Sequence, residues 1–355
     1  MVHWDGAGNL PPQRALGREL VRRGHDVHAL THDSLAEAVS SDGVTFHRLA
    51  TAYQYASPHR LTAEEEGPVL GAKVGGSLAF AADFMGVADR LRPDICLVDG
   101  GLISVLVAAR QRPEPCIVLW HWIYMARQAS ALFDPTLNEI AGGGGDLNFV
   151  DFVESFPLLL AFGYPEFCLQ QDFPASVQHV GPIREPLETS AWPRRYNDRP
   201  FVLVSLSTSF QRQTATLQRL CDALVPLPVE ALVTTGPSVA VEDLRVGGGV
   251  QVQGFVPHDR VVGMADLIVT HARHGTVLPM LCIPMGRDQH FDASRVEALG
   301  LGRSLSPDSP PDEIGRTVMD MIGDTALRAA SRSFAARVSR FGELERGANL
   351  VEQML

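Results

Sequence analysis

The first half of the chain alternates short apolar runs with segments whose apolar residues recur at helical spacing. Val2 to Trp4 is predicted to form a short strand, followed by a glycine turn at residues 5–9. Prolines 11 and 12 suit the first turn of a helix, expected over 11–23, in which Leu16 and Leu20 form an apolar stripe. Further strands are expected at 26–30, 44–49, 95–98 and 117–120, and further helices after a cap at Ser34 and over 102–110. Residues 50–85 and 124–165 are looser and rich in Gly, Ala, Phe and Tyr, which is typical of lids and pocket walls.

The second half repeats the alternation. Strands are expected at 201–205, 230–234, 250–255, 267–270 and 280–283, and helices over 214–224, over 259–265 and from about 312 onward. Alternating strands and helices predict parallel sheets covered by helices. The predicted fold class is therefore α/β, with two Rossmann-like parallel-sheet domains that face each other across a cleft, where a ligand is expected by default.

The domain boundaries follow from composition. The segment 183–200 is charged and contains prolines, as linkers do. We expect one domain at 1–182 and a second at 201–340, and the last helix, 341–355, could return to the first domain.

The charge balance limits which classes of partner the chain can bind. Across the 355 residues, 41 acidic side chains outnumber 30 basic ones, for a formal net charge of -11. This argues against nucleic acid and against an anionic membrane surface as partners, since both attract basic proteins. Lys73 is the only lysine, and its small-residue loop is a poor setting for a catalytic amine.

The cysteines and the apolar runs point to a cytoplasmic protein. The five cysteines contain no Cys-x-x-Cys pair, and Cys96, Cys116 and Cys282 lie inside apolar runs, where cysteine is usually a small core residue. The expected location is a reducing cytoplasm, with no signal peptide and no apolar run of the length that spans a bilayer.

Candidate chemistry gathers where predicted strands of the second half end. His271, Gly275 and Thr276 follow the strand at 267–270, and a Gly-Thr pair that enters a helix offers backbone N–H groups to an anion. Asp288 and Gln289 follow the next strand and could bracket the hydroxyls of a sugar. The simpler interpretation of each is a helix cap or a structural histidine, but their gathering at one sheet edge favours a site.

These residues match a known pattern. The second half resembles the nucleotide-sugar glycosyltransferases of the GT-B fold that decorate antibiotics, macrolides and other lipophilic compounds. The resemblance is carried by Phe255-Val256-Pro257-His258, Ala265-Asp266, Val269-Thr270-His271, Gly275-Thr276, Pro284 and Asp288-Gln289, with further matches near Val233 and Val180.

The resemblance implies a donor site in the second domain and an acceptor site in the first. The implied donor-binding residues are Ser207, Thr208, Thr235, Gly236, Val256, His271, Gly275, Thr276, Asp288 and Gln289. Of these, His271, Gly275 and Thr276 would hold the diphosphate, Val256 would lie by the base, and the Asp-Gln pair would bind sugar hydroxyls. The family needs no metal, and the sequence has no Asp-x-Asp motif to bind one.

Two features depart from the family pattern. Arg273 stands where the family has small residues, and it could either aid a diphosphate or block it. Only nine residues separate Thr270 from Met280, whereas a parallel crossover that contains a helix needs about ten to twelve or more. Either this sequence lacks residues of the natural protein, or the chain has been altered, or its donor site has degraded.

The first strand-to-helix loop and the ends of two later strands offer candidates for the catalytic base. In the family it lies in the first strand-to-helix loop, and the corresponding residue here is Asn9, which is neutral. Asp5 in the same loop is the first candidate, and its alternative role is to form a tight turn. Asp99, which resembles the family carboxylate that orients the base, is the second, and His121 is the third.

The acceptor is expected to be small, flat and apolar. Candidate acceptor-binding residues are Tyr53, Phe84, His121, Trp122 and Tyr124. The loop at residues 5–11 also resembles a glycine-rich dinucleotide-binding motif, with Gly6 and Gly8 as its first two glycines. Pro11 replaces the third glycine of that motif, which counts against binding of NAD or FAD. No cofactor is therefore expected.

The function predicted is a metal-independent, inverting transfer of a hexose or deoxyhexose from a UDP- or TDP-sugar to a natural-product acceptor. Two alternatives stay open. One is a nucleotide-sugar epimerase, and the Phe- and Tyr-rich segments 50–85 and 124–165 argue against it. The other is a non-catalytic sugar-nucleotide-binding or helper homologue, which Asn9, Arg273 and the short crossover favour. The sequence also leaves a homodimer open.

Overall fold

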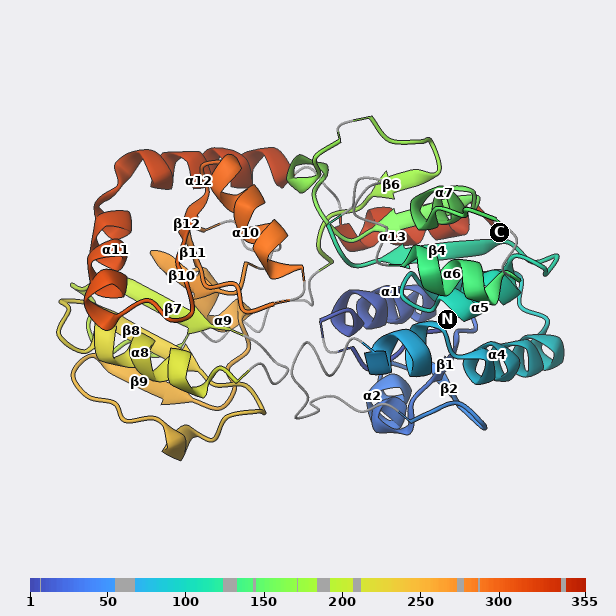
Figure 1. The fold of residues 1–355 in the computed structure, drawn as a ribbon, viewed down its shortest axis with the longest axis horizontal. Coiled ribbons are helices and arrows are strands. Elements are labelled where there is room, and N and C mark those ends of the chain that lie inside the picture. The colour runs from blue at the N-terminus through green and yellow to red at the C-terminus, as the bar shows by residue number, and fades with distance from the viewer. Residues whose placement is uncertain are drawn as a thin grey trace. The chain divides into compact units, whose positions relative to one another are not determined.

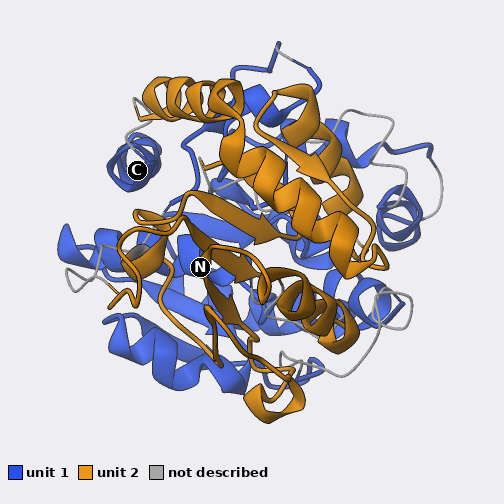
Figure 2. Ribbon diagram, turned by 90° about the vertical axis from the view of Figure 1, so that its left-hand side faces the viewer, with its two compact units in different colours: residues 1–57, 64–185, 341–355 blue, residues 58–63, 186–340 orange. Residues whose placement is uncertain are grey.

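A computed structural model describes residues 1–6, 8–54, 68–123, 133–142, 145–170, 172–183, 192–206, 212–272, 278–286, 288–339 and 343–355. The chain forms two compact units, drawn in Figures 1 and 2. Unit 1 consists of residues 1–57, 64–185 and 341–355, and unit 2 is made mainly of residues 186–340. Among the described residues, no helix is both long and apolar enough to cross a membrane.

Unit 1 contains a parallel sheet. Its strands are β1 (His28–Thr31), β2 (Thr45–Arg48), β3 (Cys96–Asp99), β4 (Cys116–Trp120), β5 (Leu158–Ala161) and β6 (Val177–His179). The order is β2-β1 on one side and β3-β4-β5-β6 on the other. Val2 forms parallel bridges to Leu30 and to Val98, so the first chain segment lies between β1 and β3 and joins the two groups of strands.

Helices cover unit 1. They are α1 (Leu10–Arg22), α2 (Ala36–Ser41), α4 (Leu78–Leu91), α5 (Ile103–Ala109), α6 (Asp134–Ile140), α7 (Phe149–Glu154) and α13 (Glu343–Glu352), with short turns η1 (Asp33–Leu35), η2 (Leu70–Gly75) and η4 (Pro165–Phe167). The sheet face that carries Leu97, Leu119 and Leu160 shares a core with α1, α2 and α13. A second helical layer forms where α5 contacts β3, α7 contacts β5 and α4 packs against α5.

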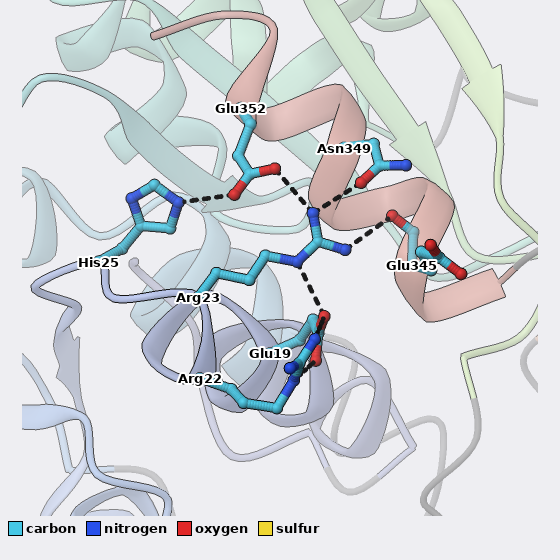
Figure 3. Close-up of polar contacts among 7 residues, drawn as sticks. All are labelled: Glu19, Arg22, Arg23, His25, Glu345, Asn349 and Glu352. Carbon is cyan, nitrogen blue, oxygen red and sulfur yellow. Dashed lines mark hydrogen bonds and ion pairs between the residues drawn. The ribbon is translucent and has the colours of Figure 1, made fainter.

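The last helix, α13, belongs to unit 1 and packs on α1 (Figure 3). Arg23 lies at the centre of this contact and donates to Asn349 at 2.6 Å and to Glu352 at 2.7 Å. Its Nε also donates to Glu19 at 2.8 Å, and His25 Nε2 lies 2.9 Å from the other oxygen of Glu352. These polar contacts surround an apolar core in which Ala348 and Val351 are buried.

Unit 2 contains a six-stranded parallel sheet. Its strands are β7 (Phe201–Ser205), β8 (Glu230–Thr234), β9 (Val250–Gln253), β10 (Leu267–Thr270), β11 (Met280–Cys282) and β12 (Gly302–Ser304). They lie in the order β12-β11-β10-β7-β8-β9. Numbered from β7, this is the order 3-2-1-4-5-6 of a Rossmann sheet read from its other edge.

The helices of unit 2 follow the apolar stripes of the sequence. They are α8 (Thr214–Leu224), α9 (Asp259–Val262), α10 (Gln289–Ala298), α11 (Pro311–Gly323) and α12 (Thr325–Val338), with a short turn η5 (Val241–Asp243). In α8 the buried residues Leu217, Leu220, Cys221 and Leu224 recur at spacings of three and four, so one face of the helix meets the sheet. Helix α11 packs against α8 in the same core.

The fold class expected from sequence, α/β with parallel sheets, is confirmed. The expectation that 50–85 and 124–165 are loose inserts was wrong in part, because α4, α6, α7 and β5 lie within or across them. Helices α6 and α7 and strand β5 span only four to seven residues, and α4 is largely apolar, so their periodicity is faint and their packing on neighbouring elements identifies them. Ser34 is not a cap, since its hydroxyl donates to Asp5 at 2.8 Å.

Candidate active site

Each sheet has one place where neighbouring strands are followed by connections that run in opposite directions. In unit 2 this point lies between β7 and β10, and in unit 1 it lies between the Val2 segment and β3. The loops that leave the carboxyl ends of the strands diverge there and open a crevice, which is where α/β sheets bind ligands. The candidate site residues are therefore expected at these two points.

In unit 1, the side chain of Asp99 is the centre of the site. It ends β3 and has no exposed surface. Oδ1 accepts hydrogen bonds from Trp4 Nε1 at 3.2 Å and from the Gly101 backbone N–H at 2.8 Å. Oδ2 accepts from Asn9 Nδ2 at 2.9 Å and from Gln13 Nε2. Both carboxylate oxygens are thus supplied with donors from three different segments of the chain.

These contacts decide the ionisation of Asp99. Burial by itself raises its pKa, but the nearby His121 and the hydrogen bonds from Asn9 and Gly101 outweigh burial and lower the pKa to about 2. The carboxylate is therefore negatively charged at all ordinary pH values. A base with so low a proton affinity is a poor proton acceptor near neutral pH, so Asp99 is suited to hold its neighbours in place.

The prolines of α1 explain why Asn9 turns toward Asp99. Asn9 is the N-cap of α1, where an Asn side chain usually accepts hydrogen bonds from the backbone N–H groups of the second and third helical residues. Those residues are Pro11 and Pro12, which have no N–H. The Asn9 side chain makes no cap hydrogen bond, and its amide instead donates to Asp99 and to the Trp4 carbonyl at 3.3 Å.

Two glycines let this cluster close. A Cβ atom on Gly6 would lie 2.6 Å from Asn9 Oδ1 and 2.7 Å from the Trp4 ring. A Cβ atom on Gly101 would lie 3.1 Å from Asp99 Oδ1 and 3.3 Å from the Trp122 ring. Gly6 and Gly101 thus let side chains pack closely against the backbone.

His121 approaches Asp99 from the next strand. It follows β4, and the register that pairs Asp99 with Leu119 places the two residues at the same edge of the sheet. His121 Nδ1 lies 3.4 Å from Asp99 Oδ2, within ion-pair distance but outside hydrogen-bond geometry. The His121 side chain is 12% exposed, whereas Asp99 has no exposed surface. Among these polar groups, His121 therefore has its own access to the surface.

An aromatic cluster borders His121. The Trp122 ring centroid lies 4.0 Å from that of His121 and 5.6 Å from that of Phe133. Phe133 and Trp120 in turn contact Phe149, at 5.0 Å and 5.9 Å. Trp122 and Phe133 are half-buried, so they offer apolar surface beside the polar cluster.

The first candidate base, Asp5, is 7% exposed, and its Oδ2 accepts the hydrogen bond from Ser34. The structure therefore joins Asp5 to the connection that follows β1. Its role as a base stays a prediction.

The acceptor candidates do not all gather at the same edge. Trp122 and His121 lie beside Asp99. Phe84, in contrast, lines a cavity of about 280 Å³ together with His28 and Cys96, which begin β1 and β3. This is the amino-terminal edge of the sheet, opposite to the Asp99 cluster. Tyr53 is 41% exposed and lies under the Lys73 ammonium at 4.9 Å, and Tyr124 lies outside the described residues.

At the corresponding edge of unit 2, Ser205 and His258 meet. The Ser205 hydroxyl, at the end of β7, lies 2.9 Å from His258 Nε2, and His258 is the N-cap of α9. Ser207 and Thr208 lie outside the described residues. Val256 is buried in this unit.

The turn after β8 is already engaged with its neighbours. The N–H groups of Thr235 and Gly236 donate to the carbonyls of Gln253 and Gly254, both at 3.0 Å, and so continue the ladder with β9. The Thr235 hydroxyl donates to the Gly236 carbonyl at 3.1 Å. The backbone N–H groups of these two predicted donor-binding residues are therefore used within the protein, because the strand pairing extends past β8.

The connection from β10 to β11 is unusually short for neighbouring parallel strands. Thr270 pairs with Cys282, and His271 follows β10 directly. Ala272 is buried and has φ of 79°, a left-handed conformation that is strained for alanine. Gly275 and Thr276 lie outside the described residues, as does Arg273.

After β11, Asp288 and Gln289 mark the start of α10. Asp288 is the N-cap and makes no cap hydrogen bond through its side chain. The Gln289 side-chain oxygen accepts a hydrogen bond from the Met285 N–H at 2.8 Å, so this end of the amide orders the loop before the helix.

Sequence reasoning missed Trp4 and Gln13 as partners of Asp99. Gln13 lies four residues after Asn9, which places both on one face of α1, and this spacing was a usable signal. No local signal marks Trp4, because its contact with Asp99 spans 95 residues.

Known proteins resemble this chain in sequence and in fold. No family model matches the chain. A segment of 178 positions, covering 47% of this chain and 41% of the relative, is 30% identical to the oleandomycin glycosyltransferase of Streptomyces antibioticus. An alignment of 382 positions covers 100% of this chain and 96% of an NDP-glycosyltransferase of Bacillus subtilis, with 21% identity. The crystal structure of CalG4, the calicheamicin glycosyltransferase, superposes with a TM-score of 0.81 at 21% identity and covers 99% of this chain and 96% of that one.

In sequence the chain is similar to natural-product glycosyltransferases, and its fold matches the GT-B fold of solved glycosyltransferases. The chain spans less than half the length of the oleandomycin glycosyltransferase and of a zeaxanthin glucosyltransferase of Pseudescherichia vulneris, and nearly all of the Bacillus relative. The glycosyltransferase alignment with the Bacillus relative runs over more positions than the 355 residues of this chain, so gaps fall on this chain.

Proposed function

We propose that this chain transfers a hexose or deoxyhexose from a UDP- or TDP-sugar to a small, flat, apolar acceptor. The observation that carries the proposal is the buried, ionised Asp99 at the carboxyl edge of the unit 1 sheet. A fixed anion there can orient a neighbouring base and stabilise the positive charge that this base gains when it takes up a proton. The family relatives named above are glycosyltransferases, which supports the same reaction class.

The donor half of the proposal concerns unit 2. Ser205 ends β7 and His271 follows β10, on the two sides of the point where the connections reverse direction, and His258, the N-cap of α9, contacts Ser205. By family resemblance, Ser207, Thr208, Gly275 and Thr276 complete a site for the diphosphate, and Asp288 and Gln289 hold the sugar. Histidine and hydroxyl donors bind phosphate oxygens without a metal, so we propose a metal-independent, inverting displacement.

The acceptor half concerns the aromatic cluster of unit 1. Trp122 and Phe133 present half-buried rings next to His121, which suits a flat apolar molecule with one hydroxyl directed at the polar cluster. Phe84 is left out of this proposal because it lies at the opposite edge of the sheet.

One alternative is favoured by particular observations. Asn9 cannot act as a base, and the nine-residue connection between β10 and β11 contains the strained Ala272. A non-catalytic homologue that binds a sugar nucleotide, or that has lost this binding, would also show these features.

Calorimetric titration of the purified chain with UDP and with TDP, without added metal, tests the proposal. We expect one of them to bind with a micromolar dissociation constant, and we expect His271→Ala to weaken that binding roughly tenfold or more, the worth of one charge-assisted hydrogen bond. His47→Gln, on β2 of the other unit, is the matched control and should bind as the wild type does. Absence of binding, in protein whose intact mass equals that of the printed sequence, would contradict the proposal and favour the non-catalytic alternative.

A further inference from the structure

The loop that is expected to supply the base holds a residue that cannot serve as one. The Asn9 amide donates to Asp99 and to the Trp4 carbonyl, and a carboxamide takes up no proton near neutral pH. Asp99 itself is fully buried, has its oxygens occupied by donors and has a pKa of about 2. The proton of an acceptor hydroxyl must therefore go to another group.

His121 stands where such a group is needed. Its Nδ1 lies 3.4 Å from Asp99 Oδ2, on the same carboxylate oxygen that Asn9 contacts. A carboxylate beside Nδ1 favours the neutral tautomer with the proton on Nδ1, and this tautomer leaves the lone pair on Nε2. The His121 side chain is also partly exposed and borders the aromatic surface of Trp122.

From this geometry we infer that His121 is the catalytic base, with Asp99 as its fixed partner and Asn9 as a neutral donor that holds Asp99 in place. The inference deepens the proposed function and rests on it. It assigns the base to His121, which follows β4, instead of to the position of Asn9 in the loop before α1.

The step balances as follows. The acceptor oxygen forms a bond to the anomeric carbon of the donor sugar while its proton passes to His121 Nε2. The bond between the anomeric carbon and the diphosphate oxygen breaks, and the nucleoside diphosphate leaves with that electron pair. The imidazolium that results is stabilised by the Asp99 carboxylate, and attack opposite to the leaving group inverts the anomeric configuration.

Asp5 is the competing carboxylate. Its Oδ2 is bound to the Ser34 hydroxyl, and it lies in the turn before Asn9, whereas His121 has both a charged partner and aromatic surface beside it. Asp5→Asn therefore belongs in the test as a comparison.

The experiment uses the full chain and the variants His121→Gln, His121→Ala and Asp5→Asn, with His47→Gln as the histidine control. UDP-glucose and TDP-glucose are the donors, phenol and 4-nitrophenol are the acceptors, and nucleoside diphosphate release without acceptor measures hydrolysis. Nucleotide binding by calorimetry and the unfolding midpoint are measured for each variant, so that loss of a base is separated from loss of the donor site or of the fold.

We expect His121→Gln to bind the nucleoside diphosphate as the wild type does and to lose about 100-fold or more in kcat, the usual worth of a general base. The loss should be much smaller with 4-nitrophenol at pH 8 than with phenol, because 4-nitrophenol is then already largely ionised and needs no base. A merely structural role for His121 would lower both rates equally.

Three results would overturn the inference. One is a kcat of His121→Gln within about threefold of the wild type, and another is a large loss confined to Asp5→Asn. The third is nucleotide binding by the wild type with neither transfer nor hydrolysis, which would show that the donor site is intact and that His121 does not act as a base. Failure of nucleotide binding itself would instead refute the proposed function and the inference together.

A spectroscopic measurement tests the geometry without turnover. A long-range proton–nitrogen correlation spectrum of histidine-labelled protein, with the His121 signals assigned by their absence in His121→Gln, reports the tautomer. We expect the proton on Nδ1, and a proton fixed on Nε2 would overturn the assignment.

Discussion

Replacing Asp99 by asparagine should lower the free energy of unfolding by more than the same replacement of any surface acidic residue in unit 1. The substitution keeps the shape but exchanges one acceptor oxygen for an NH2 group. In one orientation this group faces the donors Asn9 and Gln13, and in the other it faces Trp4 and the Gly101 N–H. Two hydrogen bonds to a charged acceptor are therefore lost in either case.

The loss in the free energy of unfolding can be worked out in two ways. Two hydrogen bonds to a charged group are worth roughly 3–6 kcal/mol together, before relief of the buried charge offsets part of that loss. The shift of the Asp99 pKa from 3.8 to about 2 corresponds to roughly 2–3 kcal/mol of stability that the ionised carboxylate contributes at neutral pH. We expect Asp99→Asn to lose about 3 kcal/mol in the free energy of unfolding.

Urea unfolding followed by tryptophan fluorescence is a suitable assay, because Trp4, Trp120 and Trp122 all lie in unit 1. The folded-state pKa is depressed, so the contribution of Asp99 is present above about pH 4 and is lost as the pH falls toward 2. The wild type should therefore lose roughly 1 kcal/mol more than Asp99→Asn between pH 6 and pH 3.

Asp89→Asn is the matched control. Asp89 lies on α4 in the same unit, is 68% exposed and pairs with Arg112 at 2.7 Å, so its loss should cost less than about 1 kcal/mol. If Asp99→Asn proves as stable as Asp89→Asn at neutral pH, or if the gap between wild type and variant does not narrow at acid pH, the reasoning about the Asp99 cluster is refuted.

Three further predictions concern other parts of the chain. Gly6→Ala should destabilise unit 1 by about 1–3 kcal/mol because its Cβ atom would lie 2.6 Å from a buried amide oxygen, whereas Gly86→Ala, in the open middle of α4, should be neutral or stabilising by up to about 1 kcal/mol; urea unfolding compares the two. Arg23→Ala removes the polar links between α1 and α13, so backbone amides of α13 should exchange with solvent about fivefold faster, a loss of about 1 kcal/mol in local stability, while no change in exchange would contradict this role. Burial raises the pKa of Cys221 to about 11 and that of Cys282 to about 12, so both should resist iodoacetamide at pH 8 in the folded protein and react after unfolding, as peptide mapping would show.

Much of the fold could be predicted from local patterns. The strands β7, β8 and β10 and the helix α8 have the predicted bounds, because each combines a clear apolar period with a turn or a cap at its ends. The α/β class followed from the alternation of such elements. The family pattern in the second half was also readable, since its residues lie close together along the chain. The elements that were missed, α4, α6, α7 and β5, are short or largely apolar, so their type is decided by the neighbours on which they pack.

The grouping of polar side chains depended on tertiary structure. The sequence offered Asp5, Asp99 and His121 in that order as candidate bases, but it could not show that Asp99 and His121 meet, because local patterns do not reveal which segments lie side by side. The register of β3 with β4 brings His121 to Asp99, and the place of Val2 between β1 and β3 brings Asn9 to the same carboxylate.

The same reasoning explains the misplacement of Phe84. Its apolar character in the sequence suited a pocket wall, but α4 carries it to the amino-terminal edge of the sheet, away from Asp99. Composition and period determine which residues are buried and in what elements. Which buried residues meet at one edge of a sheet is decided by strand order and register, and these depend on contacts between residues that are distant in the sequence.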